Sequence, residues 1–262
     1  MSKEVWQIRL LLHFNRPFLV ATPCHQRYST SDMTIYVITL FLEMFDGPLG
    51  HSMMLKAQKK NLAVFTIVDL REFGEGERRT VDDTPYGGGD GMLLKPGPVV
   101  AAIESVKAKS PEARVILLTP RGQNLVQAKA QQLAAAEQDL ILVCGRYEGF
   151  DERIHAFVDE ELSVGDYVLT GGEIPALIVI DSVVRLLPGV LGGESSAEIE
   201  SFHDGKSVEF PQYTRPEEFR GMKVPEVLLS GHHGEIEAWR QAESQKLTTQ
   251  RRSDARESEP SS

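Results

Sequence analysis

Glycine-rich segments that follow apolar runs are the first feature of this sequence that could do chemistry. Glycine lets a backbone approach a ligand closely, so glycines at strand ends favour a nucleotide or adenosine pocket, although each segment alone also fits a plain turn. No G-x-G-x-x-G joins a strand to a helix and no G-x-x-x-x-G-K-[ST] occurs, which argues against a dinucleotide oxidoreductase and a P-loop NTPase. The segments are residues 86–92 (YGGGDGM), 145–149 (GRYEG), 165–173 (GDYVLTGGE) and 189–193.

Metal and nucleophile chemistry has weaker support in the sequence. The acidic runs 82–83 and 159–161 have ligand types that suit Mg²⁺, yet such runs are usually solvated faces. His232 and His233 are adjacent, which is a poor spacing for joint ligation from one helix. Cys144 ends an apolar run and is predicted to be buried and inert. We therefore predict no dedicated metal site and no nucleophilic triad.

Alternating strand-like and helix-like segments must position the glycine loops. After Met33, short runs of β-branched residues and leucine alternate with stretches of helical spacing, a pattern that predicts an α/β fold with a mainly parallel sheet. Residues 173–187 are apolar almost all round and predict a buried helix, in which Arg185 is an informative exception. Strands are expected at 35–41, 64–70, 115–118, 140–143 and 167–170, and helices at 99–108, 125–136, 173–187 and 235–243.

Composition excludes several classes of protein. The chain has 262 residues with a formal net charge of −10, and no stretch approaches the roughly 18 to 20 consecutive apolar residues of a membrane-spanning helix. With only Cys24 and Cys144, a disulfide-stapled secreted scaffold and a cysteine-rich zinc site are excluded. The acidic balance argues against non-specific coating of nucleic acid but leaves room for a local basic groove. These features predict a soluble, cytoplasmic protein without membrane contact.

Shifts in composition divide the chain into five parts. Residues 1–32 are net positive and lack the pattern of a domain, so we expect an upstream extension before Met33, with a mitochondrial-type presequence as the alternative. Residues 33–193 form the main domain, and the small polar residues of 194–205 indicate a flexible linker. A smaller domain is expected at 206–252, and a disordered tail at 253–262.

Four long segments resemble one known family, the bacterial tRNA (guanine-N1)-methyltransferases or TrmD family. They are RTVDDTPYGGGDGM (79–92), LVCGRYEGFDER (142–153), SVGDYVLTGGEIPALIVIDSVVRLLPGVLG (163–192) and YTRPEEFRGMKVPEVLLSG (213–231), and the similarity runs from about residue 33 to 252. The resemblance implies a SPOUT-type parallel sheet with a C-terminal trefoil knot, followed by a small helical C-terminal domain. It also implies a homodimer with active sites at the subunit interface. The family methylates N1 of guanosine 37 in tRNA, just 3′ to the anticodon, with S-adenosylmethionine as donor.

The resemblance places the methyl-donor pocket in three loops. A neutral, glycine-bordered pocket suits adenosine, because it offers backbone hydrogen bonds and apolar walls. A β-branched residue at Gly172 is accordingly predicted to abolish donor binding, by entering the adenosine space or blocking the turn. The first loop carries Leu118, Thr119 and Pro120; the second Gly145, Arg146, Tyr147, Glu148 and Gly149; the third Ser163, Val164, Gly165, Tyr167, Leu169, Gly171, Gly172 and Pro175.

Methylation of guanine N1 asks for a base and a cation. The N1 proton must leave as the methyl group arrives, and negative charge develops on O6. The family's base is an aspartate before a Ser-Phe pair, and Glu200 occupies that position here, with Glu198 as the nearby alternative. Arg185 resembles the arginine that faces O6, although the sequence also allows an ion pair with Asp181 four residues earlier.

Glu148 also resembles a carboxylate of the family's pocket, and the sequence leaves its role open. It is expected to contact guanine or help to bind Mg²⁺, or else to pair with Arg146 or Arg153. Residues 146–200 hold 12 acidic and 3 basic side chains, so cations that meet tRNA phosphates are expected elsewhere. These candidates are Arg71, Arg78, Arg79, Arg215, Arg220, Lys223, Arg251 and Arg252.

Two other functions remain open from the sequence alone. A catalytically silent, RNA-binding relative is suggested by Glu200 in place of the aspartate and by Leu42 in place of a proline usual in the family's opening strand. A SPOUT methyltransferase that acts on another RNA is the second alternative. Donor binding without turnover would favour the first, and turnover on a different RNA the second.

Overall fold

A five-stranded parallel sheet is the centre of the computed structural model, which describes residues 33–192 and 199–257. The strand order is β2-β1-β6-β5-β7, so the predicted α/β fold with a parallel sheet is confirmed. The expectations for residues 1–32, 193–198 and 258–262 lie outside the described residues. The strands are β1 (Met33–Thr39), β2 (Ala63–Asp69), β5 (Arg114–Asn124), β6 (Leu140–Cys144) and β7 (Glu160–Ser163).

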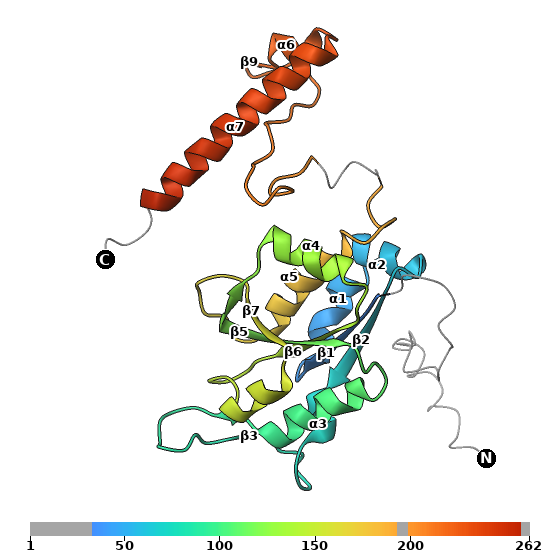
Figure 1. Ribbon diagram of the computed structural model, residues 1–262, viewed down its shortest axis with the longest axis vertical. Helices are drawn as coiled ribbons and strands as arrows, with labels where there is room; N and C mark the ends of the chain where they lie inside the picture. The colour runs from blue at the N-terminus through green and yellow to red at the C-terminus, as the bar shows by residue number, and fades with distance from the viewer. Residues whose placement is uncertain (1–32, 193–198, 258–262) are drawn as a thin grey trace, which may run out of the picture. The chain divides into compact units, whose positions relative to one another are not determined.

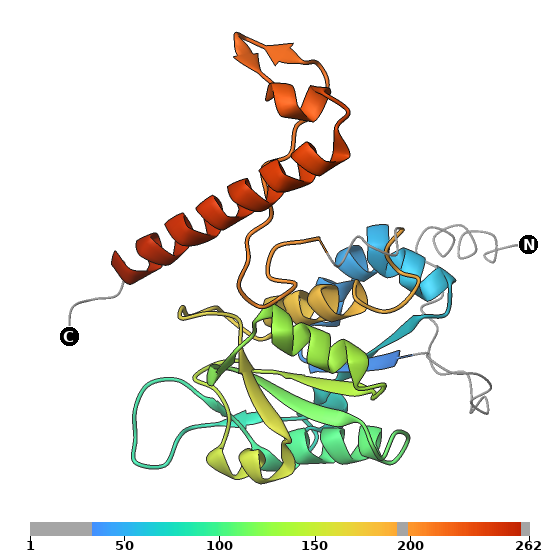
Figure 2. The same ribbon diagram turned by 45° about the horizontal axis from the view of Figure 1, so that its top comes forward.

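Helices cover both faces of this sheet (Figures 1 and 2). Neighbouring residues of β6 point to opposite faces, so Leu142 joins one apolar cluster and Val143 the other, and both are fully buried. One face carries α1 (Asp46–Leu49), α2 (Ser52–Lys59), α4 (Gln127–Ala135) and α5 (Glu173–Val184). The other carries α3 (Pro96–Lys107) with the 3₁₀ turns η2 (Leu70–Phe73) and η3 (Glu152–Phe157); the turn η1 (Leu42–Phe45) follows β1.

Short hairpins and a long helix complete the described chain. The predicted helix at 235–243 is part of α7, which continues to Glu257 and so enters the segment where the sequence predicts a disordered tail from Ser253. No helix within 33–192 or 199–257 has the length and apolarity needed to cross a membrane. The remaining elements are β3 (Asp82–Asp83), β4 (Leu93–Leu94), β8 (Glu218–Phe219), β9 (Met222–Lys223), α6 (Glu226–Leu229) and α7 (His233–Glu257).

The fifth predicted strand is displaced in the sequence. Residues 167–170 are an exposed loop, and the strand beside β5 is β7, whose sequence is acidic. Glu160 and Glu161 can lie in a strand because cations of neighbouring elements neutralise them. The prediction at 167–170 was wrong because its β-branched and leucine residues line a ligand-sized pocket instead of entering the sheet.

The apolar helix is shorter and less enclosed than expected. α5 ends at Val184, and Arg185 is its C-cap. Ile174 and Ile178, four residues apart on one side of the helix, are 48% and 39% exposed. The helix is therefore buried on most of its surface but leaves one apolar stripe uncovered.

Candidate active site

The glycine loops meet in one pocket at the carboxyl ends of β5, β6 and β7. Its volume of about 220 Å³ approaches the lower end of the roughly 300–1,000 Å³ typical of small-molecule sites. Parallel strands end at the same edge of a sheet, which is where α/β folds bind ligands. The lining residues are Thr119, Pro120, Gly145, Arg146, Tyr147, Glu148, Gly149, Phe150, Leu162, Ser163, Val164, Gly165, Tyr167, Val168, Leu169, Thr170, Gly171 and Pro175.

Backbone bonds fix the loop after β6. The amide of Glu148 donates to the carbonyl of Met92 at 3.0 Å, and the amide of Leu94 donates to the carbonyl of Gly149 at 2.9 Å. Tyr147 has a φ of 58°, in the left-handed region that residues with a side chain disfavour, whereas Gly149 reaches its φ of 116° without that cost. The surrounding bonds therefore hold a turn that the chain would not adopt alone.

Local bonds also shape the loop after β7. The hydroxyl of Ser163, which is buried, donates to the carbonyl of Gly165 at 3.0 Å. The hydroxyl of Tyr167 donates to the carbonyl of Val164 at 3.1 Å. These bonds place the exposed side chains of Tyr167 and Leu169 at the pocket wall.

Two expected donor residues do not line the pocket. Leu118 is 4% exposed and belongs to the apolar core. Gly172 packs against the end of β6, where its amide donates to the carbonyl of Gly145 at 2.8 Å. A Cβ on Gly172 would lie 2.6 Å from the Cα of Cys144 and from the amide nitrogen of Gly145. A side chain there would displace backbone, which favours the predicted block on the turn over the alternative of entry into the adenosine space.

Glu148 is an exposed residue of the pocket lining. The two arginines with which the sequence allowed it to pair have other partners. Arg146 pairs with Glu173 at 3.0 Å, and Arg153 pairs with Asp151 at 2.7 Å. The hydrogen bond from Arg153 holds the pKa of the Asp151 carboxyl below its ordinary value. The Glu148 carboxylate is thus left at the pocket, beside the glycine-rich segment 86–92. Neither that segment nor the described residues 189–192 line the pocket.

Arg185 and Glu200 face each other. The Nη2 of Arg185 donates to both carboxylate oxygens of Glu200, at 2.5 and 2.6 Å, and the two side chains are 25% and 33% exposed. The sequence also allowed a pair with Asp181, but the described contact of Arg185 with that residue is a backbone bond of 3.3 Å. Glu198 lies outside the described residues. The structure therefore joins the two residues that sequence reasoning assigned to the acceptor.

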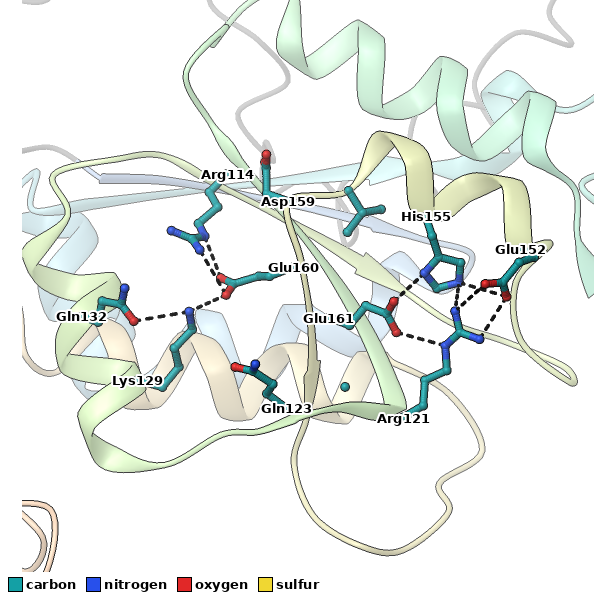
Figure 3. Close-up of a pocket in the computed structure, with 12 residues that line it drawn as sticks. Arg114, Arg121, Gln123, Lys129, Gln132, Glu152, His155, Asp159, Glu160 and Glu161 are labelled. Atoms are coloured by element: carbon teal, nitrogen blue, oxygen red, sulfur yellow. Dashed lines mark hydrogen bonds and ion pairs between the residues drawn. The ribbon is translucent and has the colours of Figure 1, made fainter.

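A second, wider hollow of about 880 Å³ lies beside β7 and contains none of the glycine loops. Figure 3 shows Arg121 pointing toward Glu152, Glu161 and His155, while Arg114 and Lys129 converge on Glu160. The hydrogen bond from Arg121 lowers the pKa of the Glu152 carboxyl. Because these charges already neutralise one another, the hollow is a weaker candidate for ligand binding than the glycine-bordered pocket.

The acidic run 159–161 belongs to this ion-pair network. Asp159 accepts a 2.7 Å bond from the amide of Val115, and its two neighbours pair with cations. The alternatives of a Mg²⁺ site and a solvated face are thus both replaced by internal pairing. Within residues 33–192 and 199–257, no group of three or more His, Cys, Asp or Glu side chains is arranged to hold a metal ion.

Cys144 is 2% exposed, which confirms the prediction of a buried thiol. Burial disfavours the thiolate and raises the thiol pKa well above its ordinary value. Sequence reasoning missed Glu173, a carboxylate that is 1% exposed behind the pocket. The available signal was a charge at the head of an otherwise apolar helix, the same signal that drew attention to Arg185.

The fold and the pocket together define a parallel α/β protein with a cavity between glycine loops at its strand ends, of a size that approaches that of small-molecule sites. The profile of the family described as tRNA (Guanine-1)-methyltransferase TrmD matches residues 33–258, and the chain belongs to that family. A tRNA (guanine-N(1)-)-methyltransferase of Geobacillus kaustophilus (strain HTA426) is 53% identical over 223 residues, covering 85% of this chain and 91% of that protein. Enzymes with the same description from Myxococcus xanthus (strain DK1622) and Bacillus subtilis (strain 168) are 54% and 52% identical, covering 84% and 87% of this chain and 89% and 94% of theirs.

Proposed function

We propose that this protein transfers the methyl group of S-adenosylmethionine to N1 of guanosine 37 in tRNA. One observation supports the proposal most directly. Fourteen of the sixteen residues expected to bind the donor line a single pocket, in a chain of the TrmD family. The sulfonium of the donor, when bound, supplies an electrophilic methyl group without the help of a metal.

The pocket residues fit an adenosine-containing donor. Gly145, Gly149 and Gly171 border the space with backbone and no side chain, while Val164 and Leu169 supply apolar wall. Such a lining gives a purine ring apolar contact and leaves peptide groups free for its edge. Arg146 and Glu148 bring charge to the same pocket. We assign Glu148 to the guanine or to a Mg²⁺ ion bound with the RNA.

Arg185 and Glu200 supply the groups that the acceptor needs. Glu200 accepts the N1 proton, and Arg185 stabilises the negative charge that develops on O6. Their ion pair leaves acceptor positions open on Glu200, since one nitrogen of Arg185 contacts both oxygens while a carboxylate can accept about four hydrogen bonds. The same pair holds the two side chains close to each other before RNA arrives. Glutamate in place of aspartate lengthens the reach of the base by one methylene.

We further propose the architecture that the family resemblance implies. Residues 33–193 form a SPOUT domain whose C-terminal half is tied in a trefoil knot, 194–205 are the interdomain linker, and 206–252 form a small tRNA-binding domain. Two copies associate, with the active site at their interface. Support for association comes from Ile174 and Ile178, whose exposed side chains leave an apolar stripe on α5.

Contacts with tRNA phosphates are assigned to cations outside the acidic segment 146–200. Two of them lie over aromatic rings: the guanidinium of Arg251 is 4.4 Å from the centre of the Phe202 ring, and that of Arg220 is 5.2 Å from the centre of the Phe219 ring. Arginine stacked on an aromatic ring keeps its charge available to phosphate. The other assigned cations are Arg71, Arg78, Arg79, Arg215, Lys223 and Arg252.

Methyl transfer to unmodified tRNA transcripts tests this function. We expect the protein to transfer labelled methyl groups to a transcript with guanine at position 37 and to leave the same transcript with adenine there unlabelled. Equal labelling of both transcripts, or of an unrelated RNA instead, would contradict the assignment. Donor binding without transfer to either transcript would identify a catalytically silent relative.

A further inference from the structure

Glu173 is the only fully buried charged residue within 33–192 and 199–257, with 1% of its side chain exposed. It is the first residue of α5, directly after the pair Gly171 and Gly172. An ionised carboxylate is strongly disfavoured in an apolar core unless it is paired and hydrogen-bonded. The carboxylate of Glu173 must therefore have a cation or a hydrogen-bond donor nearby.

Arg146 supplies the cation and Thr39 the hydrogen-bond donor. The Nη2 of Arg146 lies 3.0 Å from Oε2 of Glu173, and the hydroxyl of Thr39 donates to Oε1 at 2.7 Å. Thr39 ends β1 and in turn accepts a 3.0 Å bond from the amide of Phe41. The carboxylate is thus held from the sheet side and offers its other oxygen to the arginine.

Arg146 carries this contact to the ligand pocket. It follows β6 by two residues, lines the pocket, and donates through Nη1 to the carbonyl of Thr170 at 3.0 Å. Its guanidinium also lies 4.2 Å from the centre of the Phe41 ring. A planar guanidinium with a carboxylate on one nitrogen and a carbonyl on another has a fixed orientation. Thr170 belongs to the loop whose residues form the pocket wall after β7.

Gly171 makes room for this arrangement. A Cβ there would lie 2.6 Å from Cζ of Arg146 and 2.6 Å from Oε2 of Glu173. The ion pair therefore occupies the space that any other residue at position 171 would need. The burial of Glu173 and the absence of a side chain at Gly171 thus both favour the ion pair between Glu173 and Arg146.

We propose that Glu173 is a positioning residue for the methyl donor: it fixes Arg146, and Arg146 holds the Thr170 carbonyl and with it the pocket wall 163–171. The inference rests on the proposed function, because it assumes that this pocket takes S-adenosylmethionine. It predicts that the charge of Glu173 acts on donor affinity only through Arg146. A carboxylate that merely stabilised the fold would not act in this way.

Calorimetric titration with S-adenosylmethionine tests the proposal on Glu173→Gln, which keeps the shape and removes the charge. We expect donor affinity to fall by roughly 10- to 100-fold, the factor that one charge-assisted hydrogen bond contributes, here the bond from Arg146 to the Thr170 carbonyl that Glu173 would no longer hold in place. The donor KM should rise by a similar factor while kcat at saturating donor stays within about twofold, as expected for a loss of binding alone. Glu173→Asp keeps the charge but shortens the side chain, so its donor affinity should lie between those of the parent protein and Glu173→Gln. This variant takes the place of Glu173→Gln if the glutamine variant does not fold.

Glu160→Gln is the matched control. Glu160 is also a little-exposed carboxylate, with 13% of its side chain exposed, and it pairs with Arg114 at 2.8 Å and with Lys129, outside the donor pocket. This variant should lower Tm and leave donor affinity unchanged. In an Arg146→Met background, Glu173→Gln should add no further loss of affinity, because no guanidinium remains to be positioned. The proposal would be overturned if folded Glu173→Gln bound the donor as tightly as the parent protein. It would also be overturned if Glu173→Gln lowered donor affinity by the same factor in the Arg146→Met background.

Hydrogen exchange without ligand separates this inference from the function on which it rests. The amides of residues 163–171 should exchange faster in Glu173→Gln than in Glu160→Gln and the parent protein. If the parent protein bound no S-adenosylmethionine, the proposed function would fail while this measurement still decided whether Glu173 holds the loop. Equal exchange in all three proteins would show that it does not.

Discussion

Arg185 and Glu173 lie at the two ends of α5, and each forms an ion pair with a residue outside the helix. A cation at the end of an apolar helix predicted either an ion pair with Asp181 or a place in the site, and the side chain contacts Glu200. Glu173 is likewise a charged residue at the end of this apolar helix, but sequence reasoning did not select it. Nothing in the sequence indicates that its partner is Arg146, 27 positions earlier. Contacts between residues distant in sequence depend on the sheet order, which residue patterns do not provide.

Removal of the Arg185 guanidinium should slow the chemical step. If the arginine stabilises O6 as an oxyanion donor does, Arg185→Ala should raise the barrier by about 2 to 4 kcal/mol. Arg185→Lys keeps the charge but not the planar fork, so it should lose less. Single-turnover rates at saturating donor and tRNA measure this effect separately from binding. A rate equal to that of the parent would remove Arg185 from the chemistry.

Cys144 should be unreactive in the folded protein. Its thiol is 2% exposed and its raised pKa keeps it protonated at neutral pH, whereas thiol reagents attack the thiolate. A Cys24→Ser variant leaves it as the single cysteine, and a colorimetric thiol reagent should label it only after guanidinium unfolds the chain. Full labelling of the native protein within the mixing time would show that the end of β6 is open to solvent.

Among the elements, β7 shows where residue patterns fail. Four of the five strands could be predicted from runs of β-branched residues and leucine, which the central strand β6 buries completely and the edge strand β2 buries only in part. β7 is an edge strand whose acidic side chains pair with Arg114, Arg121 and Lys129, so its sequence resembles a solvated turn. The apolar run at 167–170 was mistaken for it because a pocket wall and a strand can share one composition.

The junction between β6 and α5 should tolerate no side chain at Gly172. A Cβ there meets backbone atoms of Cys144 and Gly145, which cannot rotate away. We expect Gly172→Val to destabilise the fold by about 3 kcal/mol or more, at the upper end of the cost of overpacking, and thus to lose donor binding through unfolding. Thermal unfolding measures this cost. Gly192→Val, at an exposed position with no atom within 4 Å of the added Cβ, is the control and should unfold like the parent.

If Gly172→Val kept the parent Tm and lost only donor affinity, the residue would belong to the pocket lining after all. That outcome would restore the direct role in adenosine binding that the sequence first suggested. The structure instead predicts that Gly172→Val lowers Tm, and that donor affinity is lost because the variant unfolds.

At the scale of the whole molecule, the family could be predicted from long segments of sequence, and the match over residues 33–258 confirms it. The parallel sheet and the gathering of the three loops could also be predicted, because strands of a parallel sheet end at one edge. The proposed chain knot is an expectation from the family resemblance and not from periodicity, since hydrophobic patterns specify which face of an element is buried and not the path by which the chain arrives.

A chain that starts at Met33 should behave like the full chain. The pattern of a folded domain begins at β1, and residues 1–32 lack it, so we expect equal Tm, equal donor affinity and the same association state. Sedimentation of both proteins measures association. Ile174→Glu with Ile178→Glu in the same background should weaken association, because it places charge on the apolar stripe of α5. Loss of dimers or activity on truncation alone would assign a role to the leading segment.

Single-turnover formation of 1-methylguanosine tests the central claim most directly, with nucleosides identified by mass after digestion of the tRNA. At saturating donor and tRNA, the parent protein should form 1-methylguanosine. Glu200→Gln should form it roughly 10²- to 10⁴-fold more slowly with donor and tRNA affinity retained, because an amide nitrogen cannot accept the N1 proton. Glu200→Asp should retain activity. Turnover of Glu200→Gln at the parent rate, or another methylated nucleoside as product, would contradict the account.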